Sequence, residues 1–348
     1  MNTKQFRLQL FVLILALLAL SGCAKKQAKL HIFNWADYMD PATVAKFEQQ
    51  FNCEVVLDTF DSNESMLAKL EAGASGYDLV FPTAYMAQQM WERKMLKPID
   101  PARIPNLKHI DSEFLATKTI DKTMQYSVPY MVGSTGIAYR KDKVENFVAS
   151  WSMFDRKDIK GRTTLLNDNR EAIGAALLFL GYSCNSRSDK ELAEAAVVLK
   201  RWKANIAKFD AEAYKPGIAS GEFFVVQGYS GDILQVQGEQ EEVVYVYPKE
   251  GFTIGLDNMC IPTGAKNVEL AHDFINFMHD PANAAANTEF VMYLCPNSTA
   301  YGLLSDAILK NPGIFIPKEA MARAEVMQHL GPDIAKYNKI WDEIKSGQ

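Results

Sequence analysis

The sequence predicts an α/β protein folded into two lobes, and three observations lead to this prediction. Segments typical of strands and of helices alternate along the chain, which favours sheets covered by helices. The 348 residues exceed what a single ordinary hydrophobic core organises. No low-complexity linker or internal repeat divides the sequence, so we expect the chain to cross between the lobes more than once.

The first elements follow the order strand, helix, strand, helix, strand. Residues 30–33, 54–60 and 77–81 are short runs rich in apolar and aromatic side chains, as strands are. Asp40 and Pro41 provide the cap and the first residue of the helix after the first strand. This order predicts a parallel sheet with right-handed crossovers.

Two further helices are expected beside these strands. Asp61 with Glu64 three residues later resembles a capping box, and it opens a helix that ends near Gly73. Met86 and Met90 lie at helical spacing after the third strand. These segments complete a first α/β lobe.

The middle of the chain repeats the same alternation with different residues. Residues 134–139, 223–226 and 243–247 are expected strands. Asp168 opens one helix, and residues 192–202 form an amphipathic one. This second set predicts the other lobe.

The N-terminus predicts export and lipid attachment. Lys4 and Arg7 precede an apolar run at 8–20, which has the length of a signal-peptide core rather than of a membrane span. The run ends in Leu-Ser-Gly before Cys23, which resembles the lipobox of bacterial lipoproteins. We therefore expect residues 1–22 to be a signal peptide and Cys23 to carry the lipid, with an ordinary signal peptide as the alternative.

Several function classes are excluded by composition and by motifs that fail. A formal net charge of −5 without a basic run argues against nucleic acid. The histidines lack metal-ligand spacing, no glycine-rich phosphate loop follows a strand, and residues 228–232 miss the nucleophile elbow by one glycine. The remaining cysteines form no CxxC pair; they are Cys53, Cys184, Cys260 and Cys295. We expect no metal, no cofactor and no catalysis.

Acidic and aromatic residues follow the strands. Each alone fits a capping or core role, but all lie where open α/β sheets bind ligands, beyond the carboxyl ends of strands. These candidates are Trp35, Asp37, Tyr38, Tyr85, Asp168, Glu171, Tyr229, Asp232, Asp257 and Tyr293.

This combination suits an organic cation. Carboxylates compensate the cost of moving an ammonium group out of water. Aromatic faces add cation–π attraction of roughly 0.5–2 kcal/mol each and cover the methylenes between charges. Acids at both ends of an aromatic slot would select a diamine. Paired carboxylates also suit a glycosidase, which is the alternative from another function class.

The order of several segments resembles the periplasmic spermidine/putrescine-binding proteins, which serve ABC importers. The resemblance covers the chain from about Leu30 to its end, and its most specific segments are 34–38, 60–64, 77–82 and 247–251, to which 129–131 and 136–139 add. It implies a type II periplasmic-binding-protein-like fold, with two lobes closing about a hinge. It also implies putrescine or spermidine as the ligand and a polyamine permease as the partner in the membrane.

The resemblance implies a division of the chain between the lobes. Residues 23–132 and 257–300 are expected in lobe 1, and 133–256 with 301–348 in lobe 2. A lipid on Cys23 would be the only attachment to a membrane, holding the protein in the periplasm.

The resemblance further implies roles for individual residues. The stacking aromatics are Trp35, Tyr38, Tyr85, Tyr229 and Tyr293. The acids that bind amines are Asp37, Asp168, Glu171 and Asp257, with Asp232 matching putrescine-type members and Gln328 matching a glutamine that contacts spermidine.

Departures from the spermidine-binding relatives favour putrescine. Gly255 stands where those relatives have tryptophan, and Ala211 where they have serine. Ala36 replaces a hydroxyl residue and Tyr229 a tryptophan. We expect a protein that captures putrescine, with spermidine as the other candidate, without turning it over. The alternatives are a solute-binding protein for another small cation and an anchored hydrolase that uses paired carboxylates.

Overall fold

The structure is a computed structural model that describes residues 27–73 and 75–347. The predicted signal peptide 1–22 and the lipid site Cys23 lie outside these residues. Across the described ranges, no helix is both long and apolar enough to cross a membrane.

The N-terminal sheet has three parallel strands in the order β2-β1-β3. They are β1 (Ala28–Trp35), β2 (Cys53–Phe60) and β3 (Leu79–Val80). Helices α2 (Pro41–Phe51) and α3 (Asn63–Glu71) connect them. The expected parallel strand–helix–strand order is confirmed.

The caps of these helices agree with the sequence in one case and differ in the other. Asp40 accepts hydrogen bonds from the amides of Ala42 and Thr43, with Pro41 as the first helical residue of α2. In α3, Ser62 is the cap rather than Asp61. The expected capping box is therefore wrong, because a Ser directly after Asp61 fills the cap position one residue later.

The second sheet has seven strands in the order β10-β9-β4-β7-β5-β6, with β8 also paired to β4. Strand β4 runs antiparallel to β7, β8 and β9, whereas the other pairs are parallel. The strands are β4 (Val128–Arg140), β5 (Thr163–Leu166), β6 (Lys208–Asp210), β7 (Val225–Tyr229), β8 (Val243–Val246), β9 (Phe252–Met259) and β10 (Ala324–Val326).

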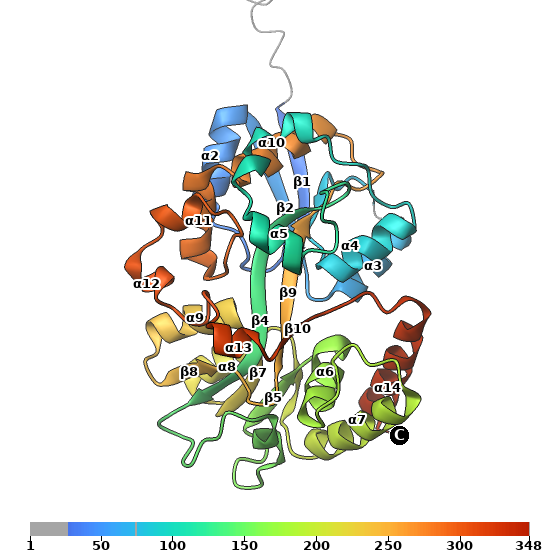
Figure 1. Ribbon diagram of the computed structural model, residues 1–348, viewed down its shortest axis with the longest axis vertical. Coiled ribbons are helices and arrows are strands. Elements are labelled where there is room, and N and C mark those ends of the chain that lie inside the picture. The colour runs from blue at the N-terminus through green and yellow to red at the C-terminus, as the bar shows by residue number, and fades with distance from the viewer. Residues whose placement is uncertain (1–26, 74, 348) are drawn as a thin grey trace, which may run out of the picture.

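Helices surround both sheets (Figure 1). Beside the first sheet lie α4 (Ala84–Glu92), α5 (Ser112–Lys118), α10 (Val268–Met278) and α11 (Pro281–Val291). Around the second lie α6 (Asn169–Phe179), α7 (Asp189–Lys203), α8 (Tyr214–Ser220), α9 (Ser230–Glu239), α13 (Lys318–Met321) and α14 (Ile334–Ser346). Shorter pieces are α12 (Asp306–Leu309) and the 3₁₀ turns η1 (Pro101–Arg103), η2 (Pro105–His109), η3 (Trp151–Asp155), η4 (Ala300–Leu303) and η5 (Gly331–Asp333).

Strands β4 and β9 join the two bodies of the molecule. Figure 1 shows both running from the upper body, which holds β1 and β2, into the lower body. In addition to pairing with β4, this segment contacts the first body: Val80 of β3 bridges Cys260, the residue after β9, and Thr83 bridges Asp257 of β9. Two of the three expected lobe boundaries, 132/133 and 256/257, fall within these strands, and the third, 300/301, falls within η4; the division between the lobes stays a prediction.

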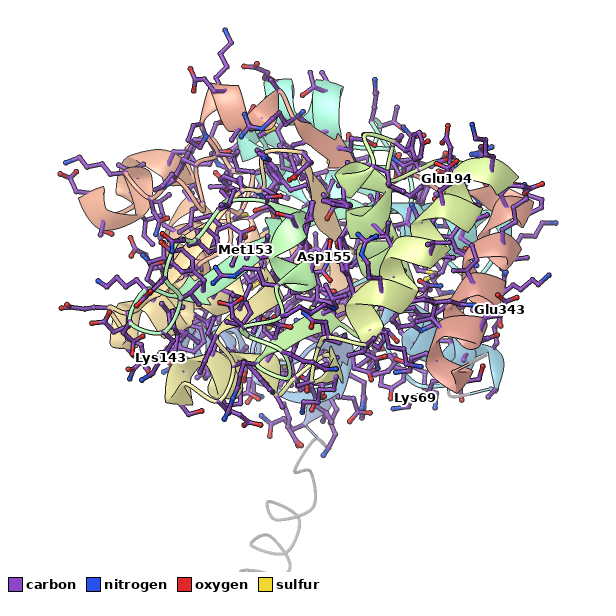
Figure 2. All side chains as sticks on the ribbon, turned by 90° about the horizontal axis from the view of Figure 1, so that it is seen from below. Lys69, Lys143, Met153, Asp155, Glu194 and Glu343 are labelled. Carbon is purple, nitrogen blue, oxygen red and sulfur yellow. The ribbon has the colours of Figure 1, made fainter. Side chains whose placement is uncertain are left out.

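Each body has its own hydrophobic core. Phe47 of α2 packs edge-on against Phe274 and Phe277 of α10 in the upper one. In the lower one, Trp151 and Trp202 are fully buried. Figure 2 looks at the lower body from below: Met153 and Asp155 of η3 lie near its centre, and Glu194 and Glu343 mark the outer helices α7 and α14. The two cores support the strands whose ends form the candidate site described below.

Candidate functional site

A cavity of about 450 Å³ contains residues from both sheets. Its lining includes every predicted site residue except Gln328: Trp35, Asp37, Tyr38, Tyr85, Asp168, Glu171, Tyr229, Asp232, Asp257 and Tyr293. Trp35 and Tyr229 are the last residues of parallel strands, and Asp168 lies two residues after the end of β5. The structure thus brings together residues that are far apart in the sequence, at the strand ends where open sheets bind ligands.

Asp257 has an incompletely satisfied carboxylate. Tyr38 donates its hydroxyl to Oδ2 at 2.8 Å. Oδ1 is buried and has no hydrogen-bond partner among the described residues. Burial raises the pKa of Asp257 to about 7, and only the Tyr38 hydrogen bond opposes this. A buried acceptor without a donor is costly, so this oxygen is suited to a donor supplied by a ligand.

Asp168 and Glu171 form a second acidic group at the start of α6. Asp168 Oδ1 accepts the amides of Arg170 and Glu171 at 2.8 and 3.0 Å, so it caps the helix as well as lining the cavity. Thr253 donates to Glu171 Oε2 at 2.7 Å. Burial raises the pKa of both carboxyls, and the charge of Asp168 raises that of Glu171 further.

Arg170 and Glu64 are neighbours of this group that the sequence reasoning missed. Arg170 is 1% exposed, and its guanidinium lies 5.3 Å from the ring centre of Tyr85. Burial, and then the charge of Asp168, raise the pKa of Glu64. A positive charge in the first turn of a helix is unfavourable because of the helix dipole. Arg170 in the first turn of α6 was therefore a signal in the sequence that acidic residues lie nearby.

Asp232 and Asp37 form the third acidic group. Asp232 accepts the hydroxyls of Tyr214 at 2.5 Å and Tyr293 at 3.1 Å, and burial raises its pKa. Asp37 is instead 76% exposed and lies 3.5 Å from the ammonium of Lys215. Asp37 therefore stands at the solvent side of the cavity, and Asp232 lies deeper.

The aromatic side chains are held in fixed positions around these acids. Trp35 donates its indole N–H to the Phe81 carbonyl at 2.9 Å. Tyr38 packs edge-on against Tyr293, with ring centres 4.8 Å apart. Tyr85 accepts a hydrogen bond from the Asn63 amide at 3.1 Å. The polar atoms of these rings thus have partners within the protein, and the rings themselves line the cavity.

Tyr293 depends on two glycines for its place. A Cβ atom on Gly133 would lie 2.7 Å from the Tyr293 ring, and one on Gly231 would lie 2.1 Å from it. Both approaches are shorter than carbon atoms tolerate, so any side chain at these positions would displace the ring.

Gln328 is the exception among the predicted residues. Its side chain is exposed and does not line the cavity, where its neighbours Val326 and Met327 are found instead. Its backbone is engaged, because its carbonyl accepts from Arg170 and its amide donates to Asn185. Gln328 therefore lies outside the cavity lining, and its contact with a ligand stays a prediction.

Metal and disulfide chemistry find no support in residues 27–73 and 75–347. No group of three or more His, Cys, Asp or Glu side chains there could hold a metal ion. The four cysteines in these ranges are free and buried, and burial raises the pKa of each thiol. They occupy apolar packing positions.

Comparison with known proteins places the chain in a family. The sequence pattern of the family described as "Bacterial extracellular solute-binding protein" matches residues 42–316. The putrescine/cadaverine-binding protein of Pseudomonas aeruginosa is 34% identical, over 96% of this chain and 98% of that protein.

Two solved structures have the same fold. The spermidine/putrescine ABC transporter substrate-binding protein PotD of Streptococcus pneumoniae superposes with a TM-score of 0.78 at 32% identity, over 92% of this chain and 99% of that one. The TpPotD lipoprotein of Treponema pallidum gives 0.82 at 35%, over 91% and 99%. The expected two-lobed binding-protein fold is confirmed, and the chain belongs to the bacterial extracellular solute-binding proteins.

Proposed function

We propose that this protein captures putrescine in the cavity between its two bodies and delivers it to the permease of an ABC importer. One observation carries the proposal: seven acidic side chains line the cavity and one basic side chain accompanies them. The three acidic groups described above contain five of the seven. A cavity with this excess of carboxylates is suited to a ligand that brings several positive charges.

The environments of the buried acids support a cationic ligand. Burial raises the pKa of Asp168, Glu171, Asp232 and Asp257, because each loses hydration without gaining a full counter-charge. An alkylammonium has a pKa of about 10.4 and is charged at neutral pH. Its N–H groups would restore both the charge balance and the missing hydrogen bonds.

The acids lie at separate places in the cavity, which favours a ligand with charges at two ends. Asp168 and Glu171 lie at the start of α6, whereas Asp257 lies on β9 and bridges Thr83, the cap of α4. Tyr229 has both acids and aromatic rings as neighbours. Burial is the main cause of its raised pKa, and Asp168, Glu171, Tyr293 and Tyr85 raise it further. Such rings would cover the methylenes of a diamine.

Putrescine is proposed over spermidine because the cavity lacks one stacking surface. A Cβ atom added to Gly255 would meet nothing within 4 Å, so the space of a larger side chain is empty there. The Pseudomonas relative named above is a putrescine/cadaverine-binding protein. Both facts support a short diamine.

Isothermal titration calorimetry tests the ligand. We expect purified, ligand-free protein to bind putrescine more tightly than spermidine, and to give no heat with neutral amino acids. Putrescine should be recovered unchanged after incubation, because family membership and the failed motifs support binding without turnover. Absence of binding to either polyamine, or glycosidase activity above background, would refute the proposal.

We propose in addition that Cys23 anchors the protein to a membrane in the periplasm. The lipobox-like residues before Cys23 support this, and the Treponema relative is itself a lipoprotein. Labelling cells with a palmitate analogue should mark the wild-type protein and not Cys23→Ala. Equal labelling of the two proteins would contradict the anchor.

A further inference from the structure

Lys215 is the single basic residue among the described residues that line the cavity. It belongs to α8, and its side chain is 23% exposed. Its ammonium donates to Gln235 Oε1 at 2.7 Å and lies 3.5 Å from Asp37 Oδ2. Its position in the sequence, next to Pro216, gave no sign of this role.

Contacts from neighbouring helices fix the position of the Lys215 ammonium. Gln235 of α9 accepts from it and donates its amide to the Val291 carbonyl at 2.9 Å, at the end of α11. A lysine fixed by two partners beside a cavity acts as a localised positive charge, unlike the mobile lysines of an open surface.

Lys215 interacts with the Asp37–Asp232 group and not with Asp257. Its neighbour Tyr214 donates to Asp232 at 2.5 Å, and the charge of Lys215 lowers the Asp232 pKa against the effect of burial. Asp257 has no cation among the causes of its pKa shift. The two acidic groups therefore differ: the Asp37–Asp232 group already has a positive charge, and Asp257 has none.

We propose that Lys215 is a specificity-determining residue, whose ammonium occupies the Asp37–Asp232 end of the cavity and thereby disfavours ligands with a third ammonium group. The inference rests on the proposed polyamine function and deepens it. A diamine can place its charges at Asp257 and at the Asp168–Glu171 group, away from Lys215. A triamine must bring its additional charge toward Lys215, where like charges repel in a poorly hydrated space.

The test is a change of preference rather than of affinity alone. Lys215→Met keeps most of the aliphatic side chain and removes the charge. Titrations of wild type and Lys215→Met with putrescine and with spermidine give four dissociation constants. We expect the constant for spermidine to fall at least tenfold more than the constant for putrescine. Lys215→Gln, a second neutral variant, should shift the ratio in the same direction.

Two control variants separate charge from other effects. Lys215→Arg keeps a positive charge and should leave the preference unchanged. Lys190→Met removes a lysine from α7 whose side chain is 81% exposed, and it should change neither constant. Melting temperatures of all variants check that they are folded.

The possible outcomes distinguish this inference from the proposed function. If both ligands bind more tightly by the same factor, Lys215 only neutralises negative charge in the cavity. If both bind more weakly, Lys215 instead stabilises the ligand-bound form through its contact with Asp37. Either result, or no change, overturns the inference while polyamine binding stands. If wild type binds neither polyamine, the proposed function itself fails.

Discussion

At the scale of single residues, burial alone does not distinguish a binding carboxylate from a structural one. Asp78 is fully buried, and it accepts the amides of His31, Lys266 and Asn267. Asp257 has one donor, Tyr38, and a second oxygen without any among the described residues. Satisfied acceptors stabilise the fold, whereas an unsatisfied one inside a cavity is suited to a ligand.

Asp257→Asn should weaken putrescine binding by roughly a hundredfold or more. The substitution keeps the shape but removes the charge opposite the ammonium, and breaking a buried ion pair costs about 3–5 kcal/mol, at about 1.4 kcal/mol per tenfold in affinity. The ligand-free protein should not melt lower, because the buried charge was itself unfavourable. Calorimetry and thermal unfolding measure the two effects.

Asp78→Asn is the contrasting variant for this experiment. An amide cannot accept from all the donors around Asp78, so this protein should melt lower yet bind putrescine as wild type does. A reversed pattern, with Asp257→Asn less stable but unchanged in affinity, would remove Asp257 from the site.

Residue types at strand ends could be predicted from the sequence, whereas roles set by tertiary contacts could not. Asp168 and Tyr229 lie at or just beyond the ends of strands β5 and β7. They could be assigned to the site because open sheets bind ligands beyond the carboxyl ends of their strands. Lys215 and Glu64 meet the other charges only after the two bodies are brought together. Gln328 was assigned by alignment alone, and a shift of one position puts Met327 in its place.

At the scale of elements, the start of α9 has to admit an aromatic ring. Gly231 lies in its first turn, directly under Tyr293, whose hydroxyl in turn donates to Asp232. Helix propensity would favour almost any other residue at this position, so the glycine is explained by the ring and not by the helix.

Gly231→Ala should weaken putrescine binding at least tenfold. The new methyl group would overlap the Tyr293 ring, which must move away from both Asp232 and Tyr38. Gly238→Ala is the matched control, because it lies in the same helix and its Cβ would meet nothing within 4 Å. Titration of both variants makes the comparison, and equal affinities would show that the ring position is unimportant.

Element types were more predictable than element boundaries. Capping residues identified α2 and α6, and periodicity identified α7; the apolar residues of all three face a core. The expected strand at 134–139 is instead part of the thirteen-residue β4, because the residues before it continue the pairing with β9. A local pattern cannot show how far a partner strand extends.

At the scale of the whole molecule, the absence of a linker predicted the joining strands. Both β4 and β9 contribute to the second sheet and reach the first body, as Figure 1 shows. Two antiparallel strands bending together suit a hinge, since their pairing keeps the bodies in register while they open. Which residues bend depends on the open form, and no sequence pattern encodes that.

Putrescine binding should weaken as pH falls from about 8 to about 6. Burial raises the pKa of Asp257 to about 7 in the ligand-free protein, so below this pH the carboxyl is protonated and must lose its proton when an ammonium binds. The ligand stays charged throughout, because its pKa is about 10.4. One such group costs up to about 1.4 kcal/mol, or tenfold in affinity, per pH unit.

The stability of the ligand-free protein should depend on pH in the opposite direction. Unfolding lets the buried carboxyl ionise, so the stability that this group contributes is lost as pH rises toward 7. Calorimetry across the range, in two buffers of different ionisation enthalpy, measures both the affinity and the protons released. Asp257→Asn should make the profile shallower without abolishing it, because burial also raises the pKa of Glu171, to about 8. An affinity independent of pH in wild type would contradict the role given to Asp257.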